Sequence, residues 1–260
     1  MNTSKRTDRY CFMILTVKDI KKSYGEHEVL RDVSFNVSEG TVSVLMGTNG
    51  SGKTTLFNII SGFVRQDEGS VLLDEESINK LKPYQRKRHG IGRTFQDMRL
   101  IGDLSVKENV MLAFPDQQGE KWWKVLLPSK KVREEQRRNS TQADHLLENC
   151  FIDDIAESKA NEISYGQQKL LNIACCMASG ASVLLLDEPA AGVNPVFREK
   201  LAAVVKKLKE QGKALLVIEH NSDFIDAVVD EILFLHNGVV QRFGSYQEFR
   251  ESPEVLNAYV

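Results

Sequence analysis

The sequence predicts an α/β protein built around a parallel sheet, and three observations support this fold class. Its apolar pattern switches repeatedly between strand-like and helix-like segments along the chain. Residues 182–187 and 213–218 are largely consecutive apolar residues, which is typical of parallel strands covered on both faces. A glycine-rich loop at 47–52 joins an apolar strand to a helix, which is the usual context of a ligand-binding loop at the carboxyl end of a strand.

The first part of the chain contains short strands and one helix. Three strands are predicted before residue 96, at 31–38, 41–46 and 70–74. The first alternates apolar and polar residues, which indicates a half-buried strand, whereas the second has the pattern of a buried strand. A helix is predicted over 53–61, directly after the glycine-rich loop, and Gly62 ends it.

The middle of the chain has few strand-like runs and much helical pattern. Residues 131–149 are strongly charged and predict an exposed amphipathic helix that turns Leu146 and Leu147 inward. We therefore expect a mostly helical subdomain inserted into the α/β core. The predicted organisation is one domain, 1–260, with the insertion at 97–180 and a core of 12–96 and 181–260.

The α/β pattern returns after residue 181. The two apolar strands at 182–187 and 213–218 flank a helix over 195–211 that is rich in Lys, Leu and Glu. Near the end of the chain, Asn237-Gly238 separates two apolar runs, and this dipeptide is the strongest short signal for a β-hairpin.

Composition and charge exclude several classes of protein. The 260 residues include 34 basic and 36 acidic side chains, and the net charge of −2 argues against binding to nucleic acid by bulk charge. The most apolar runs, such as 183–186, are far shorter than the roughly 20 residues that span a bilayer. Lys18 and Asp19 soon break the apolar stretch near the N-terminus, so we expect neither a signal peptide nor a transmembrane segment.

The cysteines indicate the redox compartment. They are Cys11, Cys150, Cys175 and Cys176. None forms a Cys-x-x-Cys pair, and this spacing favours buried free thiols in a reducing cytosol.

Residues 47–54 match the pattern Gly-x4-Gly-Lys-Ser/Thr of a phosphate-binding loop. The pattern follows a buried strand and opens a helix, where backbone N–H groups and the helix dipole both face a bound anion. Lys53 adds a positive charge for the β- and γ-phosphates of a nucleotide, and the Thr54 hydroxyl is a ligand for Mg²⁺. We therefore interpret the segment as a nucleotide site rather than a chance glycine turn.

Two acidic residues, Asp187 and Glu188, follow the apolar residues of the strand 182–187. The strand delivers them to the carboxyl edge of the sheet, where ligands bind in open α/β folds. There Asp187 can hold Mg²⁺ through water, and Glu188 can orient or deprotonate the attacking water. With the phosphate loop they predict a nucleoside triphosphatase. A GTPase is disfavoured, because residues 79–82 read Asn-Lys-Leu-Lys and Lys82 stands where the base-reading motif needs Asp.

A segment before the acid pair carries a resemblance to a known family. Residues 163–168, Ile-Ser-Tyr-Gly-Gln-Gln, precede a helix predicted over 168–179 and resemble the Leu-Ser-Gly-Gly-Gln signature of ATP-binding-cassette (ABC) ATPases. Ser164 can cap that helix, whose N-terminal end is an anion site. Further matches follow in the family's order along nearly the whole chain: Tyr24 for the aromatic residue that stacks on adenine, Gln96 for the glutamine that joins core and helical subdomain, 190–195 for the loop after the acid pair, and His220 for the switch histidine.

The resemblance implies an ATPase that binds ATP and Mg²⁺ in a P-loop NTPase core with an N-terminal antiparallel β part and an inserted helical subdomain. In the family, each ATP lies between the phosphate loop of one subunit and the signature of the other in a head-to-tail dimer. Catalytic roles are implied for Lys53, Gln96, Glu188 and His220, and metal contacts for Thr54, Gln96 and Asp187. The implied nucleotide contacts are Tyr24, Gly47, Asn49, Gly50, Ser51, Gly52, Lys53, Thr54, Thr55, Ser164, Gly166 and Gln167.

Two residues depart from the family pattern. Tyr165 stands where the first signature glycine usually lies, so the backbone there has less freedom, while Gly166, which would approach the phosphate, is retained. Asn194 stands where the loop after the acid pair usually has Asp, so this position keeps hydrogen bonding and loses charge.

Several short motifs resemble one subfamily, the ATP-binding subunits of branched-chain amino-acid uptake transporters. These are Ser-Tyr-Gly-Gln-Gln and the segments 90–96, 191–195, 217–220 and 252–260, the last matching that subfamily's C-terminal helix. Such a subunit lies on the cytoplasmic face of the inner or plasma membrane and powers separate integral membrane permease subunits, beside an identical or paralogous ATP-binding subunit. Similar motifs leave a urea-type importer and the lipopolysaccharide-export ATPase open. A soluble ABC ATPase acting on DNA or the ribosome is the rival of another class. It is disfavoured by the single cassette and the lack of sustained heptads and zinc-type cysteine spacing.

Two further features leave alternatives open. A basic cluster precedes Gln96 and consists of Lys82, Arg86, Lys87, Arg88 and Arg93. It predicts either a solvated helix face or a contact with a membrane partner or anionic lipid headgroups. The apolar patch at 122–127, Trp-Trp-Lys-Val-Leu-Leu, either packs inside the helical insertion or touches the membrane or a partner.

Overall fold

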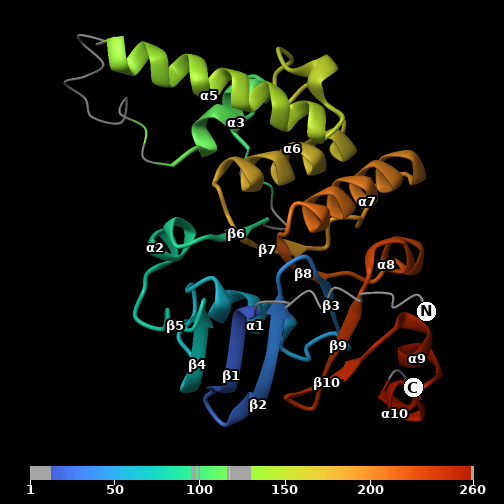
Figure 1. The fold of residues 1–260 in the computed structure, drawn as a ribbon. Coiled ribbons are helices and arrows are strands. Elements are labelled where there is room, and N and C mark those ends of the chain that lie inside the picture. The colour runs from blue at the N-terminus through green and yellow to red at the C-terminus, as the bar shows by residue number, and fades with distance from the viewer. Residues whose placement is uncertain (1–12, 95–97, 99, 116, 118–129, 259–260) are drawn as a thin grey trace, which may run out of the picture.

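The fold is centred on one large sheet. The structure is a computed structural model that describes residues 13–94, 98, 100–115, 117 and 130–258. In this part of the chain ten strands form a sheet in the order β5-β4-β1-β2-β10-β9-β3-β8-β7-β6, with helices packed against both faces (Figure 1). The predicted α/β fold class is confirmed. Cys11, Gln96 and the apolar patch at 122–127 lie outside the described residues.

One side of the sheet is antiparallel. Its strands are β1 (Met13–Tyr24), β2 (His27–Ser38), β4 (Glu68–Leu73) and β5 (Glu76–Ser77). The sequence pattern predicts β2 and β4 but gives no sign of β1. The reason is an irregularity within β1, where the register with β2 shifts between Val17 and Ile20 and Asp19 has a φ of 51°. This bulge breaks the alternation of apolar and polar residues that identifies a strand.

The other side of the sheet is mainly parallel and carries the buried strands. Its strands are β3 (Val42–Met46), β6 (Ile91–Arg93), β7 (Val183–Asp187), β8 (Ala214–Ile218), β9 (Glu231–His236) and β10 (Val239–Phe243). All residues of β3, β7 and β8 are buried, as their apolar runs predict. The predicted hairpin is confirmed, since β9 and β10 pair antiparallel around Asn237 and Gly238, whose φ angles are 50° and 78°.

Helices bury the two faces of this parallel part in separate apolar clusters. Leu45 of β3 packs on one face with α1 (Lys53–Ile60), whereas Val44 and Met46 face the cluster that includes α7 (Pro195–Glu210). Alternate residues of one strand thus contribute to opposite faces, as the pleat of a strand requires. The remaining core helices are α2 (Pro83–Arg88), α8 (Ser222–Val228), α9 (Tyr246–Glu251) and α10 (Pro253–Ala258).

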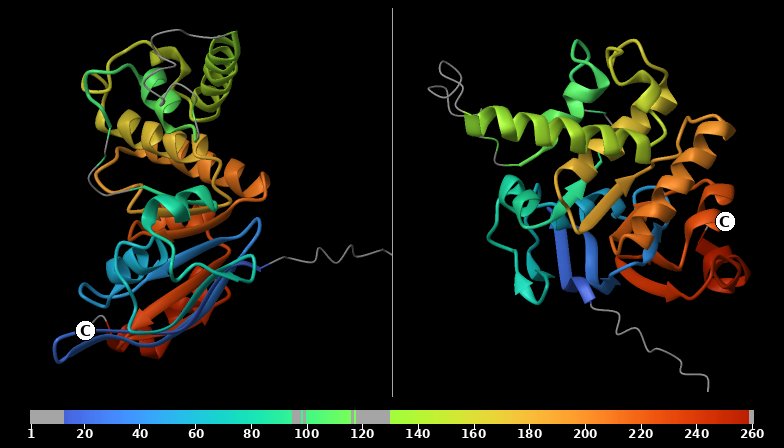
Figure 2. Two further views of the ribbon diagram at one scale, coloured as in Figure 1. Left: turned by 90° about the vertical axis from the view of Figure 1, so that its left-hand side faces the viewer. Right: turned by 45° about the horizontal axis from the view of Figure 1, so that its top comes forward.

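Between β6 and β7, the described residues form the helices α3 (Val106–Ala113), α5 (Lys130–Asn149) and α6 (Tyr165–Ala178). A short 3-10 helix, η2 (Asp153–Ile155), lies between α5 and α6. These helices gather on one side of the sheet, at the top of Figure 1, and Figure 2 shows α5 on the outside of this layer. In α5, Leu147 is buried and Leu146 partly buried, as the amphipathic pattern predicts.

Two composition-based expectations concern thiols and membranes. Cys150, Cys175 and Cys176 are free, and burial raises the pKa of each thiol to about 12. A thiol with such a pKa is unreactive at neutral pH. Among the helices that the structure describes, none is long and apolar enough to cross a bilayer.

Candidate active site

The phosphate loop connects the end of β3 to the start of α1. Two of its glycines have conformations that only glycine accepts without strain. Gly47 has a φ of 155°, and a Cβ there would lie 2.3 Å from the carbonyl oxygen of Leu235. Gly52 has a φ of 104°, and its Cβ would lie 2.9 Å from the side chains of Val29 and Leu30. The loop therefore keeps its shape because neighbouring strands press against it where side chains are missing.

The Lys53 side chain forms hydrogen bonds with the backbone of the phosphate loop. Its buried Nζ donates hydrogen bonds to the carbonyl oxygens of Gly47, at 2.7 Å, and Thr48, at 2.9 Å. Burial lowers the pKa of this ammonium group, and the negative charges of Glu188 and Asp187 act in the opposite direction. Asp187, the last residue of the distant strand β7, and Glu188 directly after it thus interact electrostatically with the lysine.

The other predicted nucleotide contacts of this loop differ in exposure. Asn49, Gly50 and Thr54 are exposed, and Ser51 and Thr55 are partly buried. The Ser51 hydroxyl oxygen is buried and has no hydrogen-bond partner among the described residues. A buried hydroxyl without a partner is costly, so it marks a place where a ligand oxygen fits.

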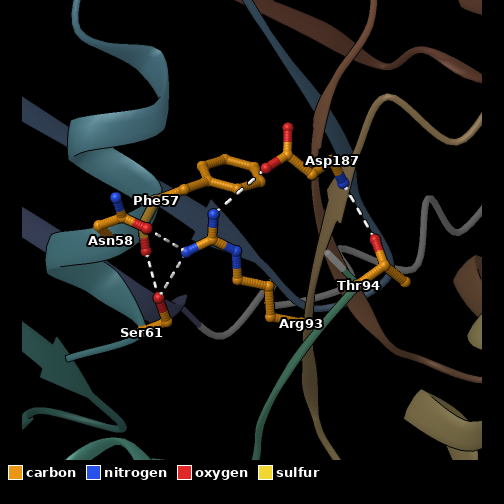
Figure 3. Close-up of polar contacts among 6 residues, drawn as sticks. All are labelled: Phe57, Asn58, Ser61, Arg93, Thr94 and Asp187. Atoms are coloured by element: carbon orange, nitrogen blue, oxygen red, sulfur yellow. Dashed lines mark hydrogen bonds and ion pairs between the residues drawn. The ribbon is translucent and has the colours of Figure 1, made fainter. Parts of the chain in front are cut away.

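Asp187 ends β7 and is held by β6 (Figure 3). Its Oδ2 lies 3.2 Å from Nη2 of Arg93, and its backbone N–H donates to the hydroxyl of Thr94 at 3.1 Å. The other carboxylate oxygen is directed away from Arg93, as Figure 3 shows. One oxygen of Asp187 is thereby held by Arg93, and the other points away from it.

Arg93 links this carboxylate to the helix that follows the phosphate loop. Its Nη1 donates to Asn58 at 2.7 Å and to Ser61 at 2.9 Å, both on or next to α1. Its guanidinium carbon lies 5.5 Å from the ring centre of Phe57, so the ring covers the cation (Figure 3). The side chain is 6% exposed, and that of Asp187 is 10% exposed.

The predicted surface role of the basic cluster is wrong for two of its members. Arg93 is enclosed as described above, and Arg86 is 2% exposed and donates to the carbonyl oxygens of Ile59 and Ile60. Lys82, Lys87 and Arg88 remain exposed. Both buried arginines instead satisfy polar groups between α1, α2 and the sheet, which a charge pattern alone does not reveal.

We expect Arg93→Leu to lower the free energy of unfolding by about 3 kcal/mol, because it leaves the buried Asp187 carboxylate without its ion pair. Urea denaturation measures this change. Lys107→Met is the matched control, since Lys107 pairs with Asp144 at 2.7 Å on a more exposed surface, and its loss should cost less than about 1 kcal/mol. Equal losses in the two variants would contradict the buried role of Arg93.

Glu188 follows directly in an unusual backbone conformation. Its φ is 48°, in the left-handed region, and three contacts hold it there. Its N–H donates to the carbonyl oxygen of Ile218 at 2.9 Å, and its own carbonyl oxygen accepts from Lys169 Nζ at 3.1 Å and from the N–H of Ala191 at 3.3 Å. A non-glycine residue keeps such a conformation only when its surroundings impose it.

His220 lies at the same edge of the sheet, after β8, with an exposed side chain. Between this histidine and the strand is Glu219, which the sequence analysis missed and which is only 2% exposed. Its carboxylate accepts backbone N–H groups from Ala190, His220 and Asn221 at 2.9, 2.9 and 3.1 Å. The sequence feature that could have identified Glu219 is its position directly after the apolar run 214–218.

The signature segment begins α6. Ser164 is its N-cap and forms a capping box with Gln167, whose N–H donates to the Ser164 hydroxyl at 3.4 Å. Gly166 is buried against α7, and a Cβ there would lie 2.7 Å from the ring of Phe197. The helix starts at Tyr165, directly after its predicted cap Ser164 and three residues before the predicted range 168–179.

The two departures from the family pattern are accommodated. Tyr165 is the first helical residue of α6 and its φ is not positive, so the position does not need glycine. Its ring is 46% exposed, with Lys169 Nζ 5.4 Å from the ring centre. Asn194 is the N-cap of α7, and its side-chain oxygen accepts the N–H of Phe197 at 3.1 Å. An aspartate at this position would form the same cap.

The predicted site residues fall into two groups. Lys53, Asp187, Glu188 and His220 come together at the carboxyl ends of β3, β7 and β8. Ser164, Gly166 and Gln167 begin α6, which lies apart from α1 in Figure 1, and no hydrogen bond within the described residues joins them to 47–55. Tyr24 ends β1 with a 51% exposed ring. Gln96 lies outside the described residues.

The chain is similar to known proteins over most of its length. The family model described as ABC transporter matches residues 30–191. The branched-chain amino acid transport ATP-binding protein BraF of Pseudomonas aeruginosa is 33% identical over 248 residues, covering 95% of this chain and 97% of that protein. The probable branched-chain amino acid transport ATP-binding protein LivG of Archaeoglobus fulgidus is 34% identical over 247 residues and 95% of each chain.

Solved structures show the same fold. A nucleotide-free ATP-binding cassette from an ABC transporter superposes with a TM-score of 0.82 at 31% identity, covering 96% of this chain and 99% of that one. A cassette in its ADP conformation superposes with a TM-score of 0.81 at 31% identity, covering 95% and 98% of the two chains.

Proposed function

The chain belongs to the ABC transporter family of ATP-binding proteins, and we propose that it powers the import of branched-chain amino acids through a separate membrane permease. As a member of this family it is an ATPase subunit. The observation that carries the proposal is the end-to-end similarity to relatives named for branched-chain amino acid transport, which spans 95% of this chain. The subunit would bind the permease at the cytoplasmic face of the membrane, where ATP is supplied.

ATP would bind with its phosphates in the loop 47–52. The left-handed glycines leave the inside of the turn free of Cβ atoms, and the buried Ser51 hydroxyl supplies a donor, so both fit a phosphate chain. Lys53 would exchange the carbonyl oxygens of Gly47 and Thr48 for the β- and γ-phosphates. The exposed ring of Tyr24 would stack on adenine. Asn49, Gly50, Gly52 and Thr55 would complete the contacts to the nucleotide.

Mg²⁺ would arrive with the nucleotide. No group of three or more His, Cys, Asp or Glu side chains stands ready to hold a metal in the part of the chain that the structure describes. The Thr54 hydroxyl, the Asp187 carboxylate and the Gln96 side-chain amide supply oxygen ligands of the kind that this cation prefers. When bound, the ion neutralises part of the charge on the phosphates. Arg93 would keep Asp187 in its orientation.

Glu188 and His220 would act on the reaction itself. Glu188 would orient the attacking water and accept its proton as the water oxygen bonds to the γ-phosphorus and ADP leaves. His220, exposed at the neighbouring strand end, would contact the γ-phosphate. The backbone anchors of Glu188 support this role, because they hold the backbone from which its carboxylate projects.

The second half of the ATP site would come from another subunit. Ser164, Gly166 and Gln167 start a helix whose N-terminal N–H groups attract anions, yet no hydrogen bond in the described structure joins them to the phosphate loop of the same chain. We infer head-to-tail pairing, in which they meet the γ-phosphate held by an identical or paralogous subunit. A solved cassette that is 27% identical to this chain, with a TM-score of 0.71 over 89% of this chain and 98% of that one, is a dimer in a post-hydrolysis state with ADP and phosphate, and it supports this arrangement.

Reconstitution tests the substrate. With its permease and substrate-binding protein in proteoliposomes, the chain should support ATP-dependent accumulation of labelled leucine, isoleucine and valine, each competing with the others. The Glu188→Gln variant should abolish this accumulation. Uptake of urea without leucine, or ATP-driven movement of lipopolysaccharide, would overturn the proposed substrate. Full ATPase activity stimulated by DNA or ribosomes, without any effect of the permease, would overturn transport altogether.

A further inference from the structure

A buried carboxylate joins the two loops that carry the proposed catalytic side chains. Glu219 is 2% exposed, and its Oε2 accepts the N–H of Ala190, while its Oε1 accepts the N–H groups of His220 and Asn221. We infer that Glu219 is a positioning residue for ATP hydrolysis, which holds Glu188 and His220 in fixed relation to each other. This inference rests on the proposed roles of those two residues.

The contacts require a carboxylate rather than another polar group. The donor of one loop faces one oxygen, and the donors of the other loop face the second oxygen. A glutamine has a single oxygen, so its NH₂ group would face N–H groups on one side. Within the described residues, no lysine or arginine forms an ion pair with Glu219, and backbone N–H groups are its charge partners.

The first loop needs such an anchor because Glu188 is in a strained conformation. At a φ of 48° its backbone is held by contacts to Ile218 and Lys169 on either side of the peptide. Ala190 is the next point at which the loop is fixed, and its N–H is held by Glu219. Without that contact the strained segment 188–190 would lose one of its anchors, and the Glu188 carboxylate would shift with the backbone.

The second loop is fixed on both sides of the histidine. Glu219 accepts the N–H of His220 itself, and the side chain of Asn221 accepts the N–H of Phe224 at 3.0 Å as the N-cap of α8. The His220 backbone therefore has little freedom, and its side chain projects from a rigid base. One carboxylate thus links the two loops beyond the point where the pairing of β7 with β8 ends.

Glu219→Gln in the full-length chain tests this inference. We expect kcat for ATP to fall about 10-fold or more, since small misplacements of reacting groups are costly. The dissociation constant of a fluorescent ATP analogue should stay within about twofold, because no hydrogen bond within the described residues joins Glu219 to the phosphate loop or to Lys53. Glu219→Asp provides a second variant that keeps the charge but is too short to reach both loops, and it should show the same split between kcat and binding.

The matched control is Asp230→Asn. Asp230 is a partly buried carboxylate that accepts the N–H of Val42 at 2.9 Å and pairs with Lys209, at the opposite ends of the strands from the site. It should lose thermal stability and keep its kcat. The inference is overturned if the Glu219 variants keep full kcat, or if their kcat falls only in proportion to a loss of melting temperature that Asp230→Asn reproduces.

A combined variant separates this inference from the proposed function. Because Glu219 is proposed to act through both Glu188 and His220, adding Glu219→Gln to the double variant Glu188→Gln/His220→Ala should not slow ATP turnover further. A further loss in that triple variant would overturn the positioning role. Full activity of Glu188→Gln alone would instead refute the catalytic assignment of Glu188, whatever the result at Glu219.

Discussion

Replacing Glu188 by glutamine is expected to lower ATP turnover by at least about a hundredfold, because general-base catalysis by a positioned side chain contributes that much. The substitution keeps the size of the side chain and the backbone contacts to Ile218 and Lys169, so ATP binding should persist. With hydrolysis blocked, ATP should hold two subunits together. Steady-state ATPase rates and size-exclusion chromatography with ATP measure the two effects.

The control for Glu188→Gln is Glu157→Gln, which removes one carboxylate from an exposed position. It should leave both turnover and elution volume unchanged. Near-normal turnover in Glu188→Gln would show that Glu188 is not the catalytic base, and His220 would then be the next residue to test for that role.

Ser164→Arg should spare ATP binding to the single subunit and block both ATP-dependent dimerisation and hydrolysis. The Ser164 side chain is exposed at the start of α6, where an arginine would fill the space that the partner's γ-phosphate needs. Fluorescent-nucleotide titration measures binding, and light scattering with ATP measures dimerisation. We expect the ATPase activity of Ser164→Arg to be as low as that of a subunit that cannot dimerise.

Mixing Ser164→Arg with Lys53→Ala tests whether the signature acts between subunits. Lys53→Ala removes the charge inside the phosphate loop and should weaken ATP binding as well as hydrolysis, but it retains an intact signature. A mixed dimer has one composite site with both halves intact and one with both halves damaged. If the two sites hydrolyse ATP independently of each other, some ATPase activity should therefore return on mixing.

Loss of the helix cap must be separated from loss of the interface. Ser105→Arg provides that control, since Ser105 caps α3 through a capping box with Glu108 like that of Ser164 with Gln167. It should cost about 1 kcal/mol of stability and leave dimerisation intact. Full activity of Ser164→Arg, or wild-type activity per subunit that does not fall on dilution below the dimer dissociation constant, would contradict a site shared between subunits.

The sequence predicts those parts of the site whose chemistry is local. The phosphate loop is recognisable because Gly47 and Gly52 occupy backbone conformations that other residues avoid. Asp187 and Glu188 are recognisable because a buried apolar strand leads directly to them. In each case neighbouring residues along the chain carry the whole signal.

Long-range polar contacts are the part that the sequence does not reveal. Arg93 reads as part of a surface cluster with its neighbours in the chain, yet its partners are Asp187 and the side chains of α1, which come from distant segments. Glu219 reads as an ordinary acid at a strand end, and its importance depends on Ala190, which lies 29 positions away. Both are buried charges whose partners appear only after the sheet has formed.

The contact between Gly166 and Phe197 changes how variants of the signature should be read. Any side chain at position 166 would run into the ring of Phe197 within the same subunit, at 2.7 Å for the Cβ alone. A Gly166 variant that fails to support transport therefore has a folding explanation as well as a nucleotide one. Pairing Gly166→Ala with Phe197→Ala would relieve the collision and leave only the effect on the phosphate. If activity returns in the double variant, the Gly166→Ala defect was one of packing. If activity stays lost, the defect lies in the nucleotide site shared between subunits.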